Sequence, residues 1–206
     1  MKMKINKKKF IYLISPNIVT NKFYKNLRLV LKTRKASIFQ MRLKSYPLKQ
    51  KIVIGKKIKN ICRDYNVKFL VNDDPHLAKK LKADGCHLGQ NDMNVLKAKK
   101  ILGKKIIGVT CHNSLSLAKK AIRSGASYIA FGAFNSSKTK KTKYTATIKI
   151  LNKASKLSKL PIVAIGGINS SNYKNLLLNK ANLLAISGYI WKNKEYKPYK
   201  AIEKFK

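Results

Sequence analysis

The stretch KFLVNDDPHLAKKLKADGCHL, residues 68–88, contains one complete strand–helix–strand unit. Its two ends, Lys68 to Val71 and Gly85 to Leu88, are short apolar runs that predict strands, and Pro75 to Ala83 between them has helical spacing. The segment Lys-Ala-Asp-Gly at 82–85 is typical of a helix end just before a strand, with glycine available for a left-handed cap. Because the strands are continuously apolar, the unit predicts a parallel sheet that is covered on its outside.

The same alternation of strand and helix recurs along the chain. Helical spacing is also found at 48–65, 95–102, 115–124 and 171–179, in segments rich in lysine. Eight strand candidates are the number that closes into a barrel, so we predict a single (β/α)8 TIM barrel, with a doubly wound open sheet as the alternative. The strand candidates are Phe10 to Ile14, Ser37 to Met41, Lys68 to Val71, Gly85 to Leu88, Ile106 to Val109, Tyr128 to Phe131, Ile162 to Ile165 and Leu183 to Ile186.

Length and cysteine content indicate one domain in a reducing compartment. The 206 residues predict a single domain, 1–206, with a basic N-terminal extension over about residues 1–8. The apolar run Phe10 to Ile14 is too short for a signal-peptide core or a membrane span, so we expect a cytoplasmic protein with no membrane partner. Cys62, Cys86 and Cys111 lack CxxC spacing, which favours free thiols over disulfides or structural zinc.

The net charge of +40 suggests attraction to polyanions, and a basic nucleic-acid-binding protein is therefore a distant alternative. Arginine supplies only five of the 47 basic residues, and the lysines are spread along the whole chain. The sequence contains no basic motif with interleaved aromatic residues, no zinc knuckle and no RNP-like segment. We therefore interpret the charge as a lysine-biased surface and expect no specific nucleic-acid partner.

Polar residues gather where the predicted strands end, which is the active-site face of such a barrel. Cations, hydroxyls and glycine amides suit phosphate oxygens, whereas carboxylates suit magnesium. Only seven residues are acidic, yet Asp73, Asp74, Asp84 and Asp92 lie within 20 residues of one another. The pattern predicts a phosphate and metal site at this face. The strand-end segments are Gln40 to Lys44, Asn72 to Asp74, His87 to Asp92, Thr110, Ser137 to Lys140, Gly166-Gly167 and Ser187-Gly188.

These segments, in this order, resemble the motifs of the thiamine-phosphate synthase family, and the resemblance covers about Phe10 to Trp191. Members of that family are TIM barrels that join a hydroxymethylpyrimidine diphosphate to a thiazole phosphate, releasing diphosphate and forming thiamine phosphate. The resemblance implies a transferase that forms a C–N bond, with these two small molecules as its partners. The matching motifs are Gln40 to Lys44, Asn72-Asp73, His87 to Asp92, Gly108 to Thr110, Ser137 to Lys140 and Ala164 to Ile168.

The resemblance also implies a role for each matching residue. Magnesium would be the cofactor, held by Asp73 and Asp92. The residues implied as catalytic are Arg42, Lys44, Thr110 and Lys140, and the three cations among them would stabilise charge on the departing diphosphate. The residues implied around the pyrimidine diphosphate are Gln40, Arg42, Lys44, Asn72, Thr110 and Lys140. Those implied on the thiazole phosphate side are Ser137, Thr139, Gly166, Gly167, Ile186 and Ser187.

Three positions depart from the family pattern. Leu43 replaces a usual acidic residue, Thr110 replaces a usual serine, and Asn135 to Ser137 stands where an aromatic residue, proline and threonine are common. A thiazole tautomerase of the same barrel family is the alternative function, because it shares Gly-Gly and a histidine after the fifth strand, here His112. The tautomerase needs neither magnesium nor a diphosphate pocket, so the retained cations and carboxylates favour the synthase. Homo-oligomerisation is left open.

Overall fold

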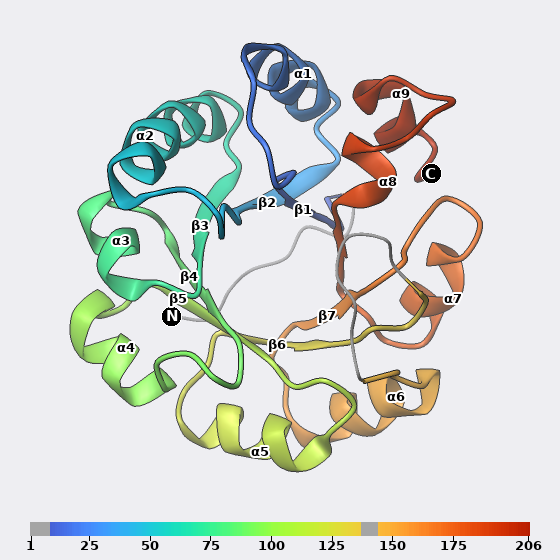
Figure 1. The fold of residues 1–206 in the computed structure, drawn as a ribbon. Coiled ribbons are helices and arrows are strands. Elements are labelled where there is room, and N and C mark those ends of the chain that lie inside the picture. The colour runs from blue at the N-terminus through green and yellow to red at the C-terminus, as the bar shows by residue number, and fades with distance from the viewer. Residues whose placement is uncertain (1–8, 137–143) are drawn as a thin grey trace.

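The structure, a computed structural model, describes residues 9–136 and 144–206 of the chain. Within this part, eight parallel strands close into a barrel, and β1 pairs with both β2 and β8. Figure 1 shows the strands around a common centre with the helices outside them. The predicted TIM barrel is confirmed and the open sheet is excluded. The strands are β1 (Ile11–Ile14), β2 (Ala36–Met41), β3 (Lys68–Asn72), β4 (Gly85–Leu88), β5 (Ile106–Thr110), β6 (Tyr128–Phe131), β7 (Ile162–Ile165) and β8 (Leu183–Ile186).

Helices alternate with the strands and cover the outside of the barrel (Figure 1). Each segment with helical spacing in the sequence contains one of them. The helix α1 shows the common pattern, because its buried Phe23, Leu27 and Leu31 recur at intervals of four residues and face the barrel. The helices of the described residues are α1 (Asn21–Lys32), α2 (Leu48–Asp64), α3 (Pro75–Lys80), α4 (Val95–Leu102), α5 (Leu115–Arg123), α6 (Ile148–Leu157), α7 (Tyr173–Leu178), α8 (Gly188–Trp191) and α9 (Pro198–Glu203).

Gly85 has a different role from the helix cap expected in the sequence. The left-handed residue after α3 is Lys82, with φ of 50°, and Gly85 is the first residue of β4. A Cβ added at Gly85 would lie 1.9 Å from the carbonyl oxygen of Ile106 in β5. The glycine is therefore required for the close approach of two neighbouring strands rather than for a backbone turn.

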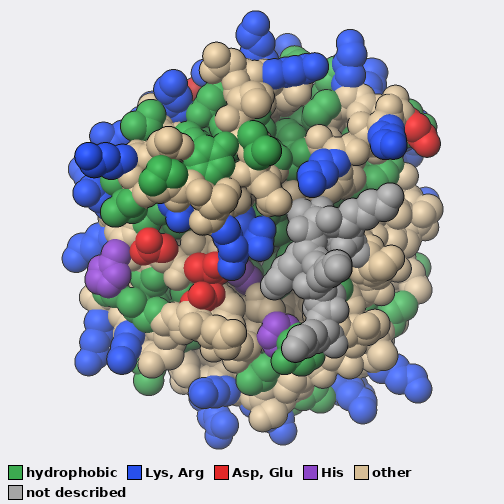
Figure 2. Space-filling view, viewed as in Figure 1, with side chains coloured by type: hydrophobic (Ala, Val, Ile, Leu, Met, Phe, Trp, Pro, Cys, Tyr) green, Lys and Arg blue, Asp and Glu red, His purple; other side chains and the backbone are tan. Residues whose placement is uncertain are grey.

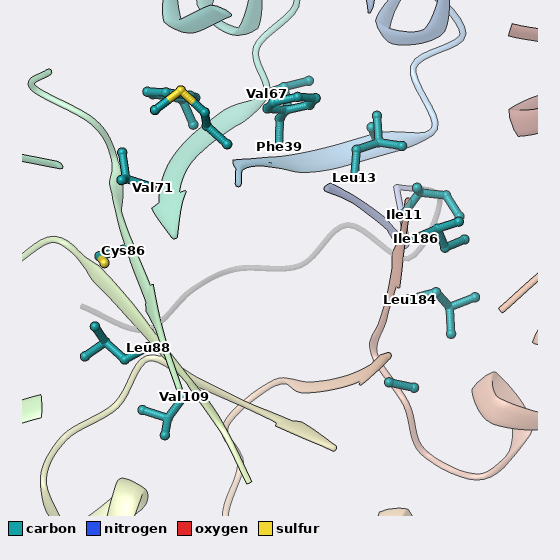
Figure 3. Close-up of a cluster of buried hydrophobic side chains, with 14 of the residues drawn as sticks. Ile11, Leu13, Phe39, Val67, Val71, Cys86, Leu88, Val109, Leu184 and Ile186 are labelled. Atoms are coloured by element: carbon teal, nitrogen blue, oxygen red, sulfur yellow. The ribbon is translucent and has the colours of Figure 1, made fainter. Parts of the chain in front are cut away.

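Side chains of each strand alternate between two hydrophobic cores. On β1, Ile11 and Leu13 point outward into the core beneath the helices, whereas Tyr12 and Ile14 belong to the smaller core inside the barrel. Figure 3 shows part of the outer core, with the labelled Leu13, Phe39 and other side chains directed away from the centre of the barrel. Both faces of every strand are thus buried, as the continuous apolar runs predicted.

Because side chains along a strand alternate between the two faces of the sheet, some polar side chains also lie inside the barrel. On β2 and β3, the buried Ile38 and Leu70 face inward, so Gln40 and Asn72 face inward at the carboxyl ends of the same strands. No helix among the described residues is long and apolar enough to cross a membrane. The single-domain assignment and the basic extension over about residues 1–8 stay predictions, and that extension lies outside the described residues.

Candidate active site

A cavity of about 800 Å³ opens at the carboxyl ends of the strands. Figure 2 shows basic and acidic side chains next to one another, beside a histidine, near a hollow in the middle of one face. Ser137, Thr139 and Lys140, which were also expected at the site, lie outside the described residues. The other predicted site residues all line the cavity: Gln40, Arg42, Lys44, Asn72, Asp73, Asp92, Thr110, Gly166, Gly167, Ile186 and Ser187.

Two carboxylates meet at the rim of this cavity. Asp73 follows β3 in a left-handed conformation, with φ of 65°, and its backbone N–H donates to the His87 carbonyl at 2.7 Å. Asp92 accepts from the backbone N–H of Gly89 at 2.7 Å, and its carboxyl group lies beside that of Asp73. A Cβ on Gly89 would lie 2.9 Å from Asp92 Oδ2, so glycine leaves room for this carboxylate. The loops after the neighbouring strands β3 and β4 thus bring the two acids together.

The two carboxylates have opposite pKa shifts. Burial and the neighbouring Asp73 raise the pKa of Asp92 above its ordinary value. Burial also acts to raise the pKa of Asp73, but the neighbouring Lys44 and Asp92 outweigh it and the pKa is lowered. Two adjacent carboxylates of this kind repel each other when both are ionised, and a bound cation removes that repulsion.

The other two clustered aspartates are structural. Asp74 accepts from the backbone N–H of Leu77 at 2.9 Å and caps the N-terminus of α3. Asp84 accepts from the backbone N–H of Phe69 at 2.9 Å and pairs with Lys68 at 3.2 Å. The sequence grouped all four acids without separating these roles, because only the fold shows which carboxylates reach the cavity.

The cationic side of the cavity follows β2. Lys44 Nζ lies 2.9 Å from Asp73 Oδ2, and Arg42 lines the cavity nearby. The backbone of Arg42 is fixed by the buried Ser15, whose Oγ accepts from Arg42 N at 2.8 Å. Ser187 Oγ in turn donates to the Ser15 carbonyl at 3.1 Å. Ser15, which the sequence did not single out, therefore ties together the ends of β1, β2 and β8.

Gly166 and Gly167 form the turn after β7. Both have positive φ, at 102° and 60°, which strongly favours glycine. A Cβ on Gly167 would lie 2.4 Å from the carbonyl oxygen of Ser136, and the N–H of Asn135 donates to the Gly166 carbonyl at 3.1 Å. The turn is consequently packed against the segment that follows β6, with its backbone exposed to the cavity.

A buried polar network lies beneath the cavity. Tyr12 Oη donates to Gln40 Oε1 at 2.5 Å, and Gln40 Nε2 donates to Asn72 Oδ1 at 2.6 Å. The hydroxyls of Tyr12 and Tyr128 are 2.8 Å apart. Tyr128 Oη is also 2.8 Å from His87 Nδ1. The remaining link joins His87 Nε2 to Thr110 Oγ1, again at 2.8 Å.

Sequence reasoning missed this network although one signal was present. The tyrosines occupy inward positions in strands that otherwise look like ordinary apolar core. Gly108 on β5 lies directly opposite Tyr128 in the barrel register, and a Cβ there would be 1.9 Å from the tyrosine ring. A strand glycine marks the close approach of another group, but it does not reveal which group approaches.

Two positions discussed in the sequence are also placed by the structure. His112 lines the cavity, and its ring stacks on Tyr144 with centroids 4.1 Å apart. Leu43, which departs from the family pattern, is buried in the outer core and does not line the main cavity. The hydrophobic residue at that position therefore contributes to packing between β2 and its covering helices.

The donor set suits magnesium better than a transition metal. Among the described residues no group of three or more histidine, cysteine, aspartate or glutamate side chains could hold a metal. Magnesium is usually bound by one or two carboxylates together with substrate phosphates, and the Asp73–Asp92 pair offers that arrangement. Cys62, Cys86 and Cys111 are free and buried, so none of these thiols is a ligand at the cavity.

The fold and the cavity define a (β/α)8-barrel enzyme with paired carboxylates, cations and a glycine turn at the carboxyl ends of its strands. A family profile described as thiamine monophosphate synthase matches residues 11–190, and the chain belongs to that family. The resemblance of its motifs is thereby confirmed.

Individual relatives agree with the family. The chain is 64% identical over 207 residues to a "Thiamine-phosphate synthase" of Pelagibacter ubique, covering 99% of this chain and 100% of the relative. It is 40% identical over 190 residues to a protein of the same description from Erythrobacter litoralis, covering 90% and 89%. The structure of a thiamine phosphate pyrophosphorylase from Pyrococcus furiosus superposes with a TM-score of 0.85 at 29% identity, covering 97% of this chain and 95% of that chain.

Proposed function

We propose that this barrel joins 4-amino-2-methyl-5-(diphosphooxymethyl)pyrimidine to a thiazole phosphate, releasing diphosphate and forming thiamine phosphate. It is a transferase of thiamine biosynthesis, as its family and its relatives support. The observation that carries the proposal is the Asp73–Asp92 pair beside Lys44 in the cavity of a chain from this family. Paired acids and a cation are what a diphosphate substrate with its magnesium ion requires.

On the pyrimidine side, we assign the ring to Gln40, Asn72 and Thr110, the members of the network that reach the cavity from β2, β3 and β5. Asp73 and Asp92 would hold magnesium, which neutralises charge on the diphosphate oxygens. In the reaction, the bond between the pyrimidine methylene carbon and the diphosphate oxygen breaks, and its electron pair leaves with the diphosphate. Arg42 and Lys44 stabilise the added negative charge on that leaving group. We assign the same task to Lys140, which lies outside the described residues.

On the thiazole side, the ring nitrogen supplies the electron pair for the new C–N bond to the pyrimidine methylene carbon. Gly166 and Gly167 expose their backbone to the cavity. Ile186, the last residue of β8, and Ser187, which follows it, also line the cavity. Backbone amides in such a turn suit phosphate oxygens, so we assign the thiazole phosphate to this side. Ser137 and Thr139, which lie outside the described residues, are assigned to the same phosphate.

The two rival functions differ from the proposal in what they need. A tautomerase would convert a thiazole phosphate without any pyrimidine, whereas a synthase forms no product until both substrates are present. Binding of nucleic acid through the charge alone would collapse between low and moderate salt. In Figure 2 the lysines and arginines lie around the whole visible rim rather than in one patch. This face therefore shows no single basic surface along which a nucleic acid would bind.

Incubating the full chain with each substrate alone and then with both tests the proposal against these alternatives. We expect thiamine phosphate only in the complete mixture. Conversion of the thiazole phosphate in the absence of the pyrimidine would instead identify a tautomerase.

We also propose a cytoplasmic location. The support is chemical, because Cys62, Cys86 and Cys111 are free and buried, which suits a reducing compartment. Homo-oligomerisation can be measured by sedimentation of the purified chain.

Replacing Lys44 by alanine is expected to lower kcat/KM about tenfold or more while changing the free energy of unfolding by less than about 1 kcal/mol. The reason is that the Lys44–Asp73 ion pair is exposed, with 59% of the lysine side chain accessible, but it stands at the cavity. Kinetics and thermal unfolding on the same sample provide the measurement.

Lys68→Ala is the matched control, because Lys68 forms an equally exposed ion pair with Asp84 at the start of β3, away from the cavity. We expect this variant to keep wild-type kinetics. Similar losses of activity in both variants would show that Lys44 acts only through the overall positive charge.

A further inference from the structure

The buried network links six side chains from six strands into one continuous series of hydrogen bonds. Its two ends, Thr110 and Asn72, both line the cavity, while Tyr128 in the middle is fully buried. The series is Thr110, His87, Tyr128, Tyr12, Gln40 and Asn72. A series of this kind has a direction, because each hydroxyl has one proton to donate.

Gln40 sets that direction. Its carbonyl oxygen accepts from Tyr12, and its amide nitrogen donates to Asn72. Tyr12 has therefore given its only hydroxyl proton to Gln40. The short contact between the two tyrosine hydroxyls then requires Tyr128 to donate to Tyr12.

The same reasoning extends to the other end. Tyr128 has used its proton on Tyr12, so it accepts from an N–H at His87 Nδ1. His87 Nε2 lies 2.8 Å from Thr110 Oγ1 at the far end of the series. Burial raises the pKa of both tyrosines well above the ordinary value, so both keep the protons that this direction needs. Four hydrogen bonds therefore point from His87 towards Asn72.

The direction gives the cavity a fixed polarity. Asn72 accepts at its oxygen, so its amide N–H groups remain as donors, and Gln40 keeps one further N–H. Thr110, at the other end of the series, also lines the cavity. A bound ring must therefore present acceptors to Gln40 and Asn72.

We propose that Tyr12 and Tyr128 are positioning residues that fix this polarity, and that the polarity selects a ring with acceptor nitrogens. The inference rests on the proposed function, because the aminopyrimidine is such a ring. Tyr12 acts through Gln40: without its hydroxyl, the Gln40 side-chain amide is free to turn over and offer its oxygen to the ligand. A site whose donors are fixed rejects a ligand with the opposite pattern strongly.

The test compares Tyr12→Phe with Tyr173→Phe. Tyr173 is an equally buried tyrosine whose hydroxyl donates to the Lys206 carbonyl at 2.7 Å, on α7 and away from the cavity. Each variant loses one buried hydroxyl, so a general effect on stability is expected in both. Each is assayed with the 4-amino pyrimidine diphosphate and with its 4-oxo analogue, in which a carbonyl replaces the amine and the neighbouring ring nitrogen changes from an acceptor to an N–H donor.

We expect the wild-type enzyme and Tyr173→Phe to prefer the amino substrate strongly and to the same extent. In Tyr12→Phe, kcat/KM for the amino substrate should fall about tenfold or more, and its preference over the oxo analogue should fall by a similar factor. The KM for the thiazole phosphate should not change. Equal preference ratios in all three proteins would overturn the inference.

A second readout does not depend on turnover. In the ligand-free protein, the side-chain amide resonances of Gln40, identified by their loss in Gln40→Leu, should shift and exchange faster with solvent in Tyr12→Phe but not in Tyr173→Phe. Unchanged resonances in Tyr12→Phe would overturn the inference. If the wild-type chain forms no thiamine phosphate, the proposed function fails, and these resonances still decide whether Tyr12 orients Gln40.

Discussion

Replacing Asp92 by asparagine is expected to lower magnesium-dependent kcat/KM by about 100- to 1000-fold. Among the described residues, Asp73 and Asp92 are the carboxylates that line the cavity, so the variant removes half of their negative charge from a magnesium site there. Asparagine keeps the shape of the side chain and an oxygen that can accept from Gly89. The measurement is steady-state kinetics over a range of magnesium concentrations.

The fold should tolerate this change. The pKa of Asp92 is raised above its ordinary value, which means that the charged form of this side chain is less favourable in the folded protein than in the unfolded chain. We therefore expect the free energy of unfolding to change by less than about 1 kcal/mol. Thermal unfolding of the purified variant checks that a loss of activity is not a loss of structure.

Asp84→Asn is the matched control, because it removes the same charge from a carboxylate outside the cavity. Its amide oxygen can still accept from Phe69. Wild-type magnesium dependence is expected. If Asp92→Asn kept full activity at limiting magnesium, the assignment of this carboxylate to the metal would be wrong.

Replacing Gly108 by alanine is expected to destabilise the fold by about 3 kcal/mol, which corresponds to a fall in Tm of about 6–12 °C for a chain of this length. The new Cβ would lie 1.9 Å from Tyr128 Cζ and 2.3 Å from two further ring atoms. The ring has no free space to move into, because Tyr128 is fully buried and its hydroxyl contacts Tyr12 and His87. Calorimetric unfolding measures the effect.

Gly55→Ala in α2 is the matched control, since its Cβ would also approach a side chain closely, at 2.5 Å from Leu81 Cδ1. That atom is the end of a flexible side chain, and alanine favours a helix interior over glycine by about 1 kcal/mol. We expect stability to change by no more than about 1 kcal/mol. If Gly108→Ala changed the stability as little as Gly55→Ala, the barrel interior at Tyr128 would be less tightly packed than the structure indicates.

The fold could be predicted largely from sequence because its signal is local. Continuous apolar runs such as Ile162 to Ile165 can be buried only in a sheet that is covered on both faces, and eight of them separated by helices close into a barrel. Gly85 was expected to cap a helix, and this expectation was wrong because glycine is required there by a contact with a residue far away in the chain. Ile106, whose backbone it must approach, is 21 residues away, and no turn pattern records that contact.

The site residues also fall into those that the sequence predicts and those that it does not. Strand ends share one face of a barrel, so Gln40, Asp73 and Asp92 could be grouped before any contact was known. Tyr12 and Tyr128 could not, because in sequence they look like members of apolar strands, and their hydroxyls meet across 116 residues of chain. Pairings of that kind are set by barrel closure rather than by any spacing in the sequence.

The most direct test of the central claim is to measure both products in one reaction. The full chain is incubated with the pyrimidine diphosphate and the thiazole phosphate, with magnesium or with a chelator, and thiamine phosphate and diphosphate are quantified over time. We predict equal amounts of the two products with magnesium and almost none with the chelator. Diphosphate release without thiamine phosphate, or equal turnover in the chelator, would contradict the account.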